Sequence, residues 1–494
     1  MITAAHKGKY YDVEYSIVNV SELEGELRID AEYYDPFWIK NLEEPLKKKK
    51  YDFVKNKTFF IKKGIFDISP SFYRKEGIPF IRVSNCHDEF IDENDIIFLD
   101  KEIHEKYKNL ELNRYDIVMS KVGTLGEIAI NLKFDKINFS QNNIGIKVNT
   151  SSINPFYLFM FLKSRYSLMQ IERTQSGNIQ QKLTLDDIRY LKIPIPSPDF
   201  QEFTEKLVLK AYEERKKAED LYKRAEEILL EELGLKNWKP KTKKIKIGGR
   251  EFEEEENISI RMLSEVIKAD RMDAEYWEPK YGEIENIIKS YKSGWDYLPN
   301  LVEISKEKIK IDKEKIYNYI ELADIYSNLG VVNETKEIKG ENLPSRARMK
   351  VKKGYVIMSS VEGSIDKIAL IDFEKDNLVA STGFFVFKEK EINKETLLIL
   401  LKILAKKYLI REAQGTILTA IPYYSLNRII IPKVKQQTQQ KISQLIQQSF
   451  KAKENSKKLL EIAKKTVEIY IEKDEEEGLN YARKKLNELN IEIN

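Results

Sequence analysis

Apolar residues recur at heptad spacing in one stretch that begins at Asp199 and ends at Leu235. The stretch contains no proline, and its only glycine is Gly234. The a and d positions of this frame are Thr204, Leu207, Ala211, Ala218, Leu221, Ala225, Ile228 and Leu235, with Glu214 and Glu232 as polar exceptions. The pattern predicts a helix with one narrow apolar seam, about 50–55 Å long at 1.5 Å per residue.

A second stretch of the same kind spans about Gln436 to Lys473. Its seam positions are Ile442, Ile446, Leu460, Ala463, Val467 and Tyr470, and the seam is interrupted by Ser449, Lys453 and Ser456. A lone helix with so narrow an apolar face is not stable in water. The two helices are therefore expected to pair as an antiparallel coiled coil with one mixed α/β domain at each end. The alternative, in which each helix packs on its own domain, stays open.

The segments outside these helices form an internal repeat. RIDAEYYDPFW (residues 28–38) returns as RMDAEYWEPKY (residues 271–281), and eight of the sixteen residues from Ser21 to Pro36 are identical at an offset of 243. Residues 119–130 and 187–196 likewise match residues 358–370 and 425–434. A period of about 240 residues is too long for a solenoid unit, so two copies of one whole domain are expected.

These patterns predict an α+β fold with a pseudo-twofold internal repeat. It has two similar mixed α/β domains, separated by an antiparallel pair of long coiled-coil helices. The expected boundaries are residues 1–198 for the first domain, 199–240 for the first spacer helix, 241–434 for the second domain, and 435–494 for the second spacer helix and a C-terminal tail.

The segment KTKKIKIGGREFEEEE (residues 241–256) has a basic half and an acidic half around Gly248-Gly249. Two glycines between strand-like runs are typical of a two-residue hairpin turn. Pairing outward from the turn places Lys246 opposite Glu251, Ile245 opposite Phe252, and Lys244 opposite Glu253. A β-hairpin is therefore favoured over a basic nucleic-acid patch.

Composition narrows the possible chemistry. The 494 residues include one cysteine, Cys86, and three histidines, so neither a disulfide framework nor a cysteine- or histidine-rich metal site is expected. No apolar run approaches the length of a membrane span, and we expect a cytoplasmic protein. The net charge is +4, with 84 basic and 80 acidic residues, which permits a local basic face without indicating one.

Catalytic motifs are missing from the sequence. A DNA adenine methyltransferase needs a glycine-rich cofactor loop and an Asn/Asp-Pro-Pro-aromatic motif, and a nucleotide-driven motor needs a P-loop. None of these occurs. Pro198-Asp199 with Glu214 and Lys216 only loosely resembles a nuclease motif, and solvated helix surface explains these residues better. We therefore expect a protein that is not an enzyme and that holds no metal or cofactor itself.

Polar loops recur at equivalent places in both repeats. Arginine and lysine suit guanine edges or phosphates, and asparagine and glutamine suit adenine edges. The candidate DNA-contacting residues are Arg74, Arg82, Asn85, Lys121, Thr124, Asn142, Gln175, Asn178 and Gln180 in the first repeat, and Ser359, Ser360, Thr382, Gln414 and Thr416 in the second. The alternative is that such residues simply build turns. Glu321 and Asp324 occupy the second-repeat positions of Arg82 and Asn85, which predicts one framework with two different recognition surfaces.

The order of these segments resembles a known family. KLTLDDIRYLKIPIPSPDFQ and the weaker IPYYSLNRIIIPKVKQQTQ each precede a long helix, which carries AEEILLEELGL or LLEIAKKTVEI. With IPFIRVSN and RIDAEYYDP, they look like the specificity (S) subunit of type I restriction-modification systems, and the likeness covers nearly the whole chain. The second copy departs from it, with Tyr319-Ile320-Glu321-Leu322 in place of FIRV.

The resemblance implies two target-recognition domains, each recognising one half of a bipartite double-stranded DNA site. It implies that the spacer helices hold these domains apart and bind two modification (methyltransferase) subunits, which bring S-adenosylmethionine. Restriction (motor) subunits would join through the complex and bring ATP and Mg. The competing hypothesis is a coiled-coil scaffold whose end domains bind proteins and never contact DNA.

Overall fold

The structure is a computed structural model that describes residues 15–23, 28–86, 89–93, 95–121, 127–175, 183–247, 250–255, 258–414 and 419–493. The chain divides into two units, and each takes a part of both long helices. Unit 1 consists of residues 1–214 and 454–494, and unit 2 consists of residues 215–453.

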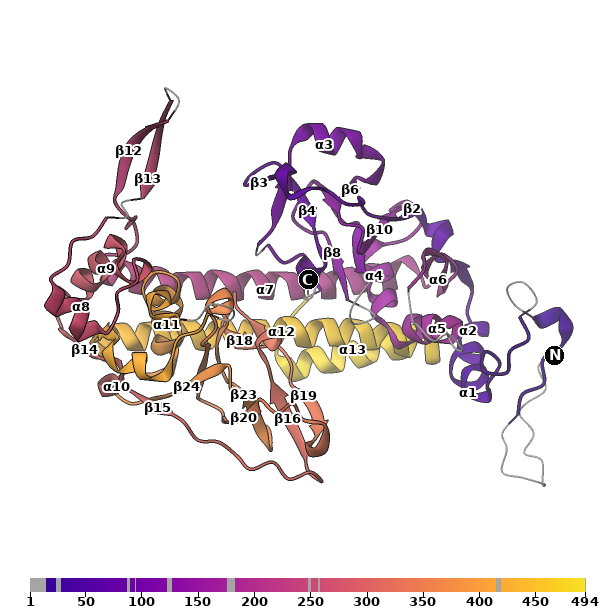
Figure 1. Cartoon of the computed structure of the whole chain (residues 1–494). Coiled ribbons are helices and arrows are strands. Elements are labelled where there is room, and N and C mark those ends of the chain that lie inside the picture. The colour runs from indigo at the N-terminus through magenta and orange to yellow at the C-terminus, as the bar shows by residue number, and fades with distance from the viewer. Residues whose placement is uncertain are drawn as a thin grey trace. The chain divides into compact units, whose positions relative to one another are not determined.

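Unit 1 is built on two main sheets (Figure 1). The first has the order β2-β10-β7-β8, with bounds Thr58–Lys63, Asn143–Val148, Ile117–Ser120 and Ile128–Ile130. The second has the order β3-β5-β4-β9-β6, with bounds Tyr73–Arg74, Ile97–Leu99, Ile78–Ile81, Lys136–Phe139 and Leu112–Asn113. Strands β4 and β9 are parallel, and all other pairings are antiparallel. A small pair joins β1 (Tyr51–Phe53) to β11 (Lys192–Pro194).

Short helices cover these sheets, and one of them is buried on every side. Helix α4 (Pro155–Lys163) starts where Asn154 accepts hydrogen bonds from the amides of Phe156 and Tyr157, and residues 155–162 are all buried. A helix that is apolar all round has to lie inside a core. The other helices of unit 1, apart from the long pair, are α1 (Pro36–Trp38), α2 (Glu44–Lys47), α3 (Lys101–Lys106), α5 (Arg165–Gln175), α6 (Leu185–Arg189) and α13 (Glu475–Leu489).

Unit 2 repeats this plan. One sheet has the order β15-β24-β21-β22-β18-β17, with bounds Val302–Ser305, Phe384–Glu389, Val356–Ser359, Ile368–Leu370, Val331–Val332 and Ile325–Tyr326. The other has the order β19-β16-β23-β20, with bounds Lys336–Lys339, Ile316–Ile320, Leu378–Ser381 and Ala347–Lys350. Strand β14 (Trp295–Tyr297) pairs with β25 (Ile430–Pro432), as β1 does with β11.

Matching features run through both units. The central strands β16 and β23 are parallel, like β4 and β9. Helix α11 (Lys394–Ala405) begins at Asn393, which accepts a hydrogen bond from the amide of Thr396 and so caps the helix as Asn154 caps α4. The remaining helices of unit 2 are α8 (Leu263–Ala269), α9 (Pro279–Lys289) and α10 (Leu298–Leu301). The order β15-β24-β21-β22 repeats β2-β10-β7-β8, as a duplicated domain predicts, and unit 2 adds β18 and β17 to this sheet.

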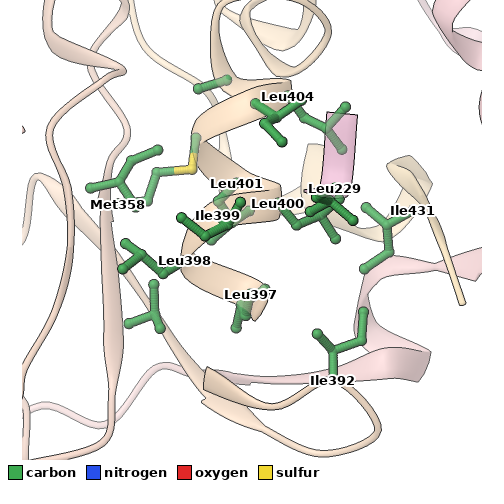
Figure 2. Packing of buried hydrophobic residues seen from close by; sticks show 14 of the residues in the cluster. Leu229, Met358, Ile392, Leu397, Leu398, Ile399, Leu400, Leu401, Leu404 and Ile431 are labelled. Atoms are coloured by element: carbon green, nitrogen blue, oxygen red, sulfur yellow. The ribbon is translucent and has the colours of Figure 1, made fainter. Parts of the chain in front are cut away.

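The core of unit 2 surrounds α11. Figure 2 shows Leu397, Leu398, Leu400 and Leu401 of this helix packed among Met358 of β21, Ile431 of β25 and Leu229 of the first long helix. The first long helix is thus part of the core of unit 2. Its residues 207, 208 and 211 belong in the same way to the core of unit 1.

The long helices are α7 (Pro198–Glu232) and α12 (Gln436–Glu472), close to the bounds expected from the sequence. In unit 1 the rings of Phe200 and Tyr470 lie 5.1 Å apart, and Asn455 Nδ2 donates to Glu214 Oε2 at 3.2 Å. In unit 2 Ser449 Oγ donates to the Ala218 carbonyl at 2.7 Å, and Thr438 Oγ1 donates to Glu232. Residue numbers therefore fall along α12 as they rise along α7 in each unit, as in an antiparallel pair.

The seam of α7 agrees with the expected frame at six of its eight named positions. Thr204, Leu207, Ala211, Ala218, Ala225 and Leu235 are buried, as expected, whereas Leu221 and Ile228 are only half-buried. At these two exceptions the buried position is shifted by one residue, to Tyr222 and Leu229, and Arg215 is buried next to the half-buried Glu214. The shift widens the buried face of α7 toward the domain. A heptad frame for two helices considers only the contacts between the helices and leaves out those with the domain. The two arrangements left open by the sequence, pairing of the helices and packing of each helix on a domain, therefore occur together.

The expected hairpin is confirmed in its register. Strand β12 (Thr242–Ile247) pairs with β13 (Arg250–Glu255), with Lys246 opposite Glu251, Ile245 opposite Phe252 and Lys244 opposite Glu253. The turn at Gly248 and Gly249 lies outside the described residues.

The repeated opening motif has the same structure in both units. Arg28 Nε donates to Asp30 Oδ1 and Arg271 Nε to Asp273 Oδ1, both at 2.6 Å. The two guanidinium groups lie 4.4 and 4.7 Å from the ring centroids of Tyr33 and Tyr276, respectively. A second buried arginine also stacks on each tyrosine, Arg173 on Tyr33 and Arg411 on Tyr276. The motif is therefore a structural clamp that fastens the start of each repeat to the segment around residue 173 or 411.

Candidate nucleic-acid interface

Three of the expected loops in unit 1 start from neighbouring strand ends. Because β4 and β9 are parallel, their carboxyl ends lie at one edge of the sheet. The amide of Ser140, just after β9, donates to the Ile81 carbonyl at 2.9 Å, and Asn143 Nδ2 donates to the same oxygen at 3.0 Å. The turn at residues 140–143 is thus fixed beside the end of β4, where Arg82 begins the next loop.

The loop after β7 joins the same edge. The amide of Lys121 donates to the Asn142 carbonyl at 2.8 Å, and the Asn142 side chain is exposed. Arg82, Lys121 and Asn142 are therefore gathered into one surface, named here edge 1. A cation beside an amide suits contacts with bases and phosphates.

Two candidates in this region have structural partners. Asn85 is fully buried: its Oδ1 accepts from the Arg82 amide at 3.0 Å, and its Nδ2 donates to the Asp92 carbonyl at 3.0 Å. This burial corrects the expectation that Asn85 contacts bases, because its amide holds the loop together. Arg82 is half-buried, and its Nη2 donates to the Asp95 carbonyl.

Arg74 lies on β3, apart from the hydrogen bonds that join edge 1. It is exposed, and its Nη2 donates to Asp100 Oδ2 at 2.8 Å. Its Nη1 donates to the carbonyls of Ser71 and Tyr73. Its charge is thus already compensated by a carboxylate of its own domain.

Some candidates cannot be placed. Thr124, Asn178, Gln180 and Thr416 lie outside the described residues. Gln175 is the last residue of α5, and its side chain also lies outside the description.

The corresponding edge of unit 2 repeats two of the contacts of edge 1. The amide of Ser360 donates to the Gly383 carbonyl at 2.9 Å, as that of Lys121 does to Asn142. Glu321 and Asp324 form the same capping arrangement as Arg82 and Asn85, with the Glu321 amide donating to Asp324 Oδ2 at 2.7 Å. The predicted equivalence of these two pairs is confirmed.

Ser359 is another correction, since it is fully buried. Its Oγ lies 2.9 Å from Ser364 Oγ and accepts from the Val361 amide at 3.1 Å, so this hydroxyl shapes the turn and cannot face DNA. Ser360 is half-buried, and its Oγ donates to the Gly383 carbonyl at 3.0 Å.

Thr382 and Gln414 complete the expected set. Thr382 is exposed, and its amide donates to the Arg346 carbonyl at 2.8 Å. Gln414 exchanges two backbone hydrogen bonds with Ala420, and its Oε1 accepts from Tyr424 Oη at 2.9 Å. The Ile421 amide donates to the Ser360 carbonyl at 2.7 Å, which brings the Gln414 segment to the same edge.

The sequence interpretation missed Arg346. Its exposed guanidinium donates through Nη2 to Glu321 Oε2 at 2.9 Å and through Nε to Tyr319 Oη at 3.1 Å. Lys336 pairs with the other Glu321 oxygen and lowers the pKa of this carboxyl. Arg346, Glu321, Lys336, Ser360 and Thr382 form the surface named here edge 2. The one available signal was the run Arg346-Ala-Arg348 at the start of a strand.

Two other kinds of site are absent from the described part of the chain. There, no group of three or more His, Cys, Asp or Glu side chains is arranged to hold a metal ion. Among the helices of the described ranges, none is long and apolar enough to cross a bilayer. Burial raises the pKa of the Cys86 thiol strongly, which disfavours the reactive thiolate.

Comparisons with known proteins place the first repeat. Residues 48–204 match the family described as type I restriction modification DNA specificity domain. The type I restriction enzyme EcoBI specificity subunit of Escherichia coli is 28% identical over 127 residues. That match covers 26% of this chain and spans about a quarter (27%) of the relative's length.

Solved structures give weaker likenesses. The S subunit from M. genitalium aligns with a TM-score of 0.37 at 14% identity, over 86% of this chain and 95% of that one. The HsdS subunit from Thermoanaerobacter tengcongensis aligns with a TM-score of 0.28 at 12% identity, over 86% and 97%. The family match does not depend on these superpositions: residues 48–204, about a third of the chain, are similar to the type I restriction modification DNA specificity domain.

Proposed function

We propose that this chain is the DNA-binding specificity subunit of a type I restriction-modification complex and that each unit recognises one half of a bipartite site. The observation that carries this proposal is the contrast between edges 1 and 2. A backbone hydrogen bond and a capping arrangement recur in both edges, but Arg82 and Lys121 in one edge stand where Glu321 and Ser360 stand in the other. One framework with two side-chain sets suits two different DNA sequences.

The side chains support distinct base preferences. In unit 1, Arg82 and Lys121 can donate to guanine O6 and N7 or to phosphates, and Asn142 can pair with an adenine edge. In unit 2, Glu321 can accept from cytosine N4, while Arg346 and Lys336 supply the positive charge that a polyanion requires. The ion pairs of Glu321 would have to rearrange for that contact, which makes Arg346 the more accessible group.

The helices α7 and α12 serve in this proposal as the spacer between the two recognition units and as a docking surface for two modification subunits. Those partners would supply S-adenosylmethionine, and restriction subunits would supply ATP and magnesium. The chain itself would hold no cofactor and would perform no catalytic step. Its contribution is to position the partners over a DNA site that it selects.

The test uses the full chain with and without the modification subunit of its own system. A gel-shift titration of DNA containing methylated sites mapped from the complex should show affinity that falls steeply as salt rises. Methyl transfer should require the partner. Salt-insensitive or absent DNA binding by the complex would favour the protein-scaffold hypothesis, and methyl transfer by the purified chain alone would show that it is an enzyme.

A further inference from the structure

One lysine recurs at the same place in both units, beside the two edges. Lys63 is the last residue of β2 in unit 1, and Lys306, 243 positions later, directly follows β15 in unit 2. The repeated opening motif has the same offset. Both lysines are exposed. Among the described residues, neither ammonium group has an ion-pair or hydrogen-bond partner, so both charges are available to a ligand.

In unit 1 the backbone fixes Lys63 beside edge 1. The amide of Gly64, the next residue, donates to the Asn143 carbonyl at 3.2 Å. A Cβ atom at residue 64 would lie 2.2 Å from the Phe139 carbonyl oxygen, so this close approach requires glycine. The turn that carries Asn142 is therefore joined directly to the end of β2, where Lys63 stands.

In unit 2 Lys306 has the same position relative to edge 2. Strands β15 and β24 are antiparallel, so Lys306 lies beside the start of β24. That strand begins just after Gly383, whose carbonyl accepts from the Ser360 amide of edge 2. Lys306 Nζ lies 5.2 Å from the centroid of the Tyr423 ring, and this ring packs edge-on against Phe385 of β24. The lysine is therefore held next to edge 2.

A cavity of about 480 Å³ opens beside Lys306. Its lining includes a second exposed lysine, Lys390, which also forms no ion pair within the described ranges. Among the described residues that line this cavity, Glu303 is the only carboxylate. The two ammonium groups suit an anionic group of a ligand.

The acidic neighbours of these lysines are themselves compensated or few. In unit 2, Glu303 pairs with Lys388 at 2.7 Å, and Glu307 pairs with Lys350 at 3.1 Å. In unit 1, Asp67 is the one acidic residue of the segment 58–75, which contains four lysines and arginines. The charge of each recurring lysine is therefore not cancelled by its surroundings.

The recurrence distinguishes these lysines from the variable side chains of the edges. Arg82 and Lys121 of edge 1 correspond to Glu321 and Ser360 of edge 2. Side chains that read bases have to differ where half-sites differ, whereas the phosphate backbone is the same in every DNA sequence. A lysine ammonium is a point charge that suits a phosphate oxygen. Lysines kept in both copies thus suit the part of DNA that both half-sites share.

We propose that Lys63 and Lys306 are equivalent phosphate-contacting residues, which position each DNA half-site against its edge without reading its sequence. This inference rests on the proposed function and names the ligand group, the phosphodiester backbone of double-stranded DNA. Each edge then selects bases from a backbone that is already fixed in register.

The experiment measures the affinity of the complex of the full chain with its modification subunit for DNA at several salt concentrations. One probe is a duplex with the methylated site mapped from the complex, and another has that site scrambled. The variants are Lys63→Gln, Lys306→Gln and the double variant, with Lys63→Arg and Lys306→Arg to keep the charge. The matched controls are Lys55→Gln and Lys292→Gln, at exposed lysines that precede β2 and β14.

Each single glutamine variant should lower the slope of log affinity against log salt by about 0.9, and the double variant by about 1.8, because each neutralised phosphate contributes about 0.9 to this slope. At 0.15 M salt the affinity should fall about fivefold for each lysine removed. Both probes should weaken alike, and half-site preference in randomised libraries should stay unchanged. The arginine variants and the controls should keep the wild-type slope.

The outcomes separate this inference from the function on which it rests. If the wild-type complex binds DNA without salt dependence, or not at all, the proposed function fails. If wild-type binding depends on salt and the glutamine variants keep its slope and affinity, the function stands and these lysines do not contact phosphates.

Three further results would also overturn the inference. Relaxed preference at one half-site would make the lysine a base-reading residue. Fewer bound modification subunits in native mass spectrometry would place it in a protein interface. A loss of affinity that the arginine variant shares would mean that the side chain has a structural role in its unit.

Discussion

Arg82 and Arg346 are the arginines that edges 1 and 2 present to a ligand, and their surroundings differ. Arg82 is half-buried and donates to the backbone carbonyl of Asp95. Arg346 is exposed beside the carboxylate of Glu321, and its bond to Tyr319 Oη raises the pKa of the guanidinium. Arg346 therefore has to leave its ion pair with Glu321 to contact DNA.

We predict that Arg82→Ala and Arg346→Ala each relax recognition of a different half-site. A bidentate arginine–guanine contact contributes about 1–3 kcal/mol of discrimination, whereas a phosphate contact weakens all sequences alike. Binding of the complex to DNA libraries randomised in one half-site distinguishes these roles.

The matched control is Arg114→Ala. Arg114 is exposed and precedes β7, whereas Lys121 of edge 1 follows the other end of this strand. It should leave half-site preference unchanged. A variant at residue 82 or 346 that keeps wild-type preference at both half-sites would show that its arginine is structural.

Asp116 gives a pH-dependent prediction. Burial raises the pKa of this carboxyl to about 6, although it accepts hydrogen bonds from the amides of Asn113 and Val148. The folded state therefore binds a proton between pH 4 and 6, where an unfolded aspartate, with a pKa of about 3.9, does not. Asp116 therefore contributes most to the free energy of unfolding below about pH 4. This contribution, roughly 2–3 kcal/mol, is lost as the pH rises to about 6.

The test compares the unfolding free energy of wild type and Asp116→Asn in urea at several pH values. The asparagine cannot titrate, and its amide can replace only one of the two acceptor oxygens, so the variant should be less stable. The stability difference between the two proteins should shrink as the pH rises from about 4.5 to 6.5. A constant difference over this range would contradict the raised pKa.

At the scale of elements, the clamp that holds the opening motif depends on buried charge pairs. Arg411 Nη1 donates to Glu285 Oε2 at 3.0 Å, and Glu412, which is fully buried, accepts from Arg428 Nε at 2.9 Å and lies 3.4 Å from Arg411 Nε. In unit 1 the matching pair is Arg173 with Glu43.

We predict that Arg411→Ala destabilises unit 2 by about 3 kcal/mol, because the half-buried Glu285 and the fully buried Glu412 lose their shared cation, although Glu412 keeps Arg428. Arg411→Lys keeps the charge but not the planar fork, so its effect should be smaller. The matched control is Arg224→Ala, which removes a surface pair with Glu227 on α7 and should cost under about 1 kcal/mol.

Urea unfolding followed by tryptophan fluorescence measures these changes. Three of the four tryptophans, Trp238, Trp277 and Trp295, lie in unit 2, so the signal reports mainly on that unit. Equal stability of the Arg411→Ala and Arg224→Ala variants would mean that the clamp does not stabilise the unit.

Local patterns predicted whole elements where the decisive contacts are close in sequence. The hairpin register followed from two glycines, and the bounds of α7 and α12 followed from the absence of helix breakers. The seam of α7 was wrong at Leu221 and Ile228, two of its eight named positions, because Tyr222 and Leu229 are the residues buried against the domain core there. Helix α13 was expected only as a tail, although Ala482 and Leu486 pack into the core of unit 1.

In the candidate site, too, local sequence predicted some features and the tertiary fold determined the others. Sequence placed the loops at the correct strand ends, but it could not show which polar side chains turn inward. Asn85 and Ser359 have ordinary loop chemistry, and only the fold shows that their partners are the Asp92 carbonyl and the Ser364 hydroxyl. Arg346 was missed because its proximity to Glu321 depends on the strand order of the sheet and not on sequence spacing.

At the scale of the whole molecule, duplication explains why one chain can combine symmetry with asymmetry. The clamps and the order of four strands in one sheet are alike in both units, and the side chains of edges 1 and 2 are not. A pseudo-twofold protein can bind identical partners through its like surfaces and an asymmetric DNA site through its unlike ones. The helices α7 and α12 contribute to both units, and in the proposed function they set the gap between the half-sites.

The last prediction tests this spacer role by lengthening both helices at one level. Four residues are inserted after Lys217 in α7 and four after Lys451 in α12, beside the contact between Ala218 and Ser449. Four helical residues add about 6 Å and about 40° of rotation. One to two base pairs of B-DNA add about 3–7 Å and about 35–70°, so the DNA can follow the protein.

We expect the complex to methylate sites with unchanged half-site sequences and a gap longer by one or two base pairs. The control inserts seven residues in each helix, which adds about 10 Å with almost no net rotation, whereas three base pairs turn DNA by about 100°. This variant should methylate poorly at any gap length, even though it preserves the heptad frame. Mapping of methylated sites measures both outcomes. Altered half-sites with an unchanged gap would mean that α7 and α12 contribute to base recognition and do not set the spacing.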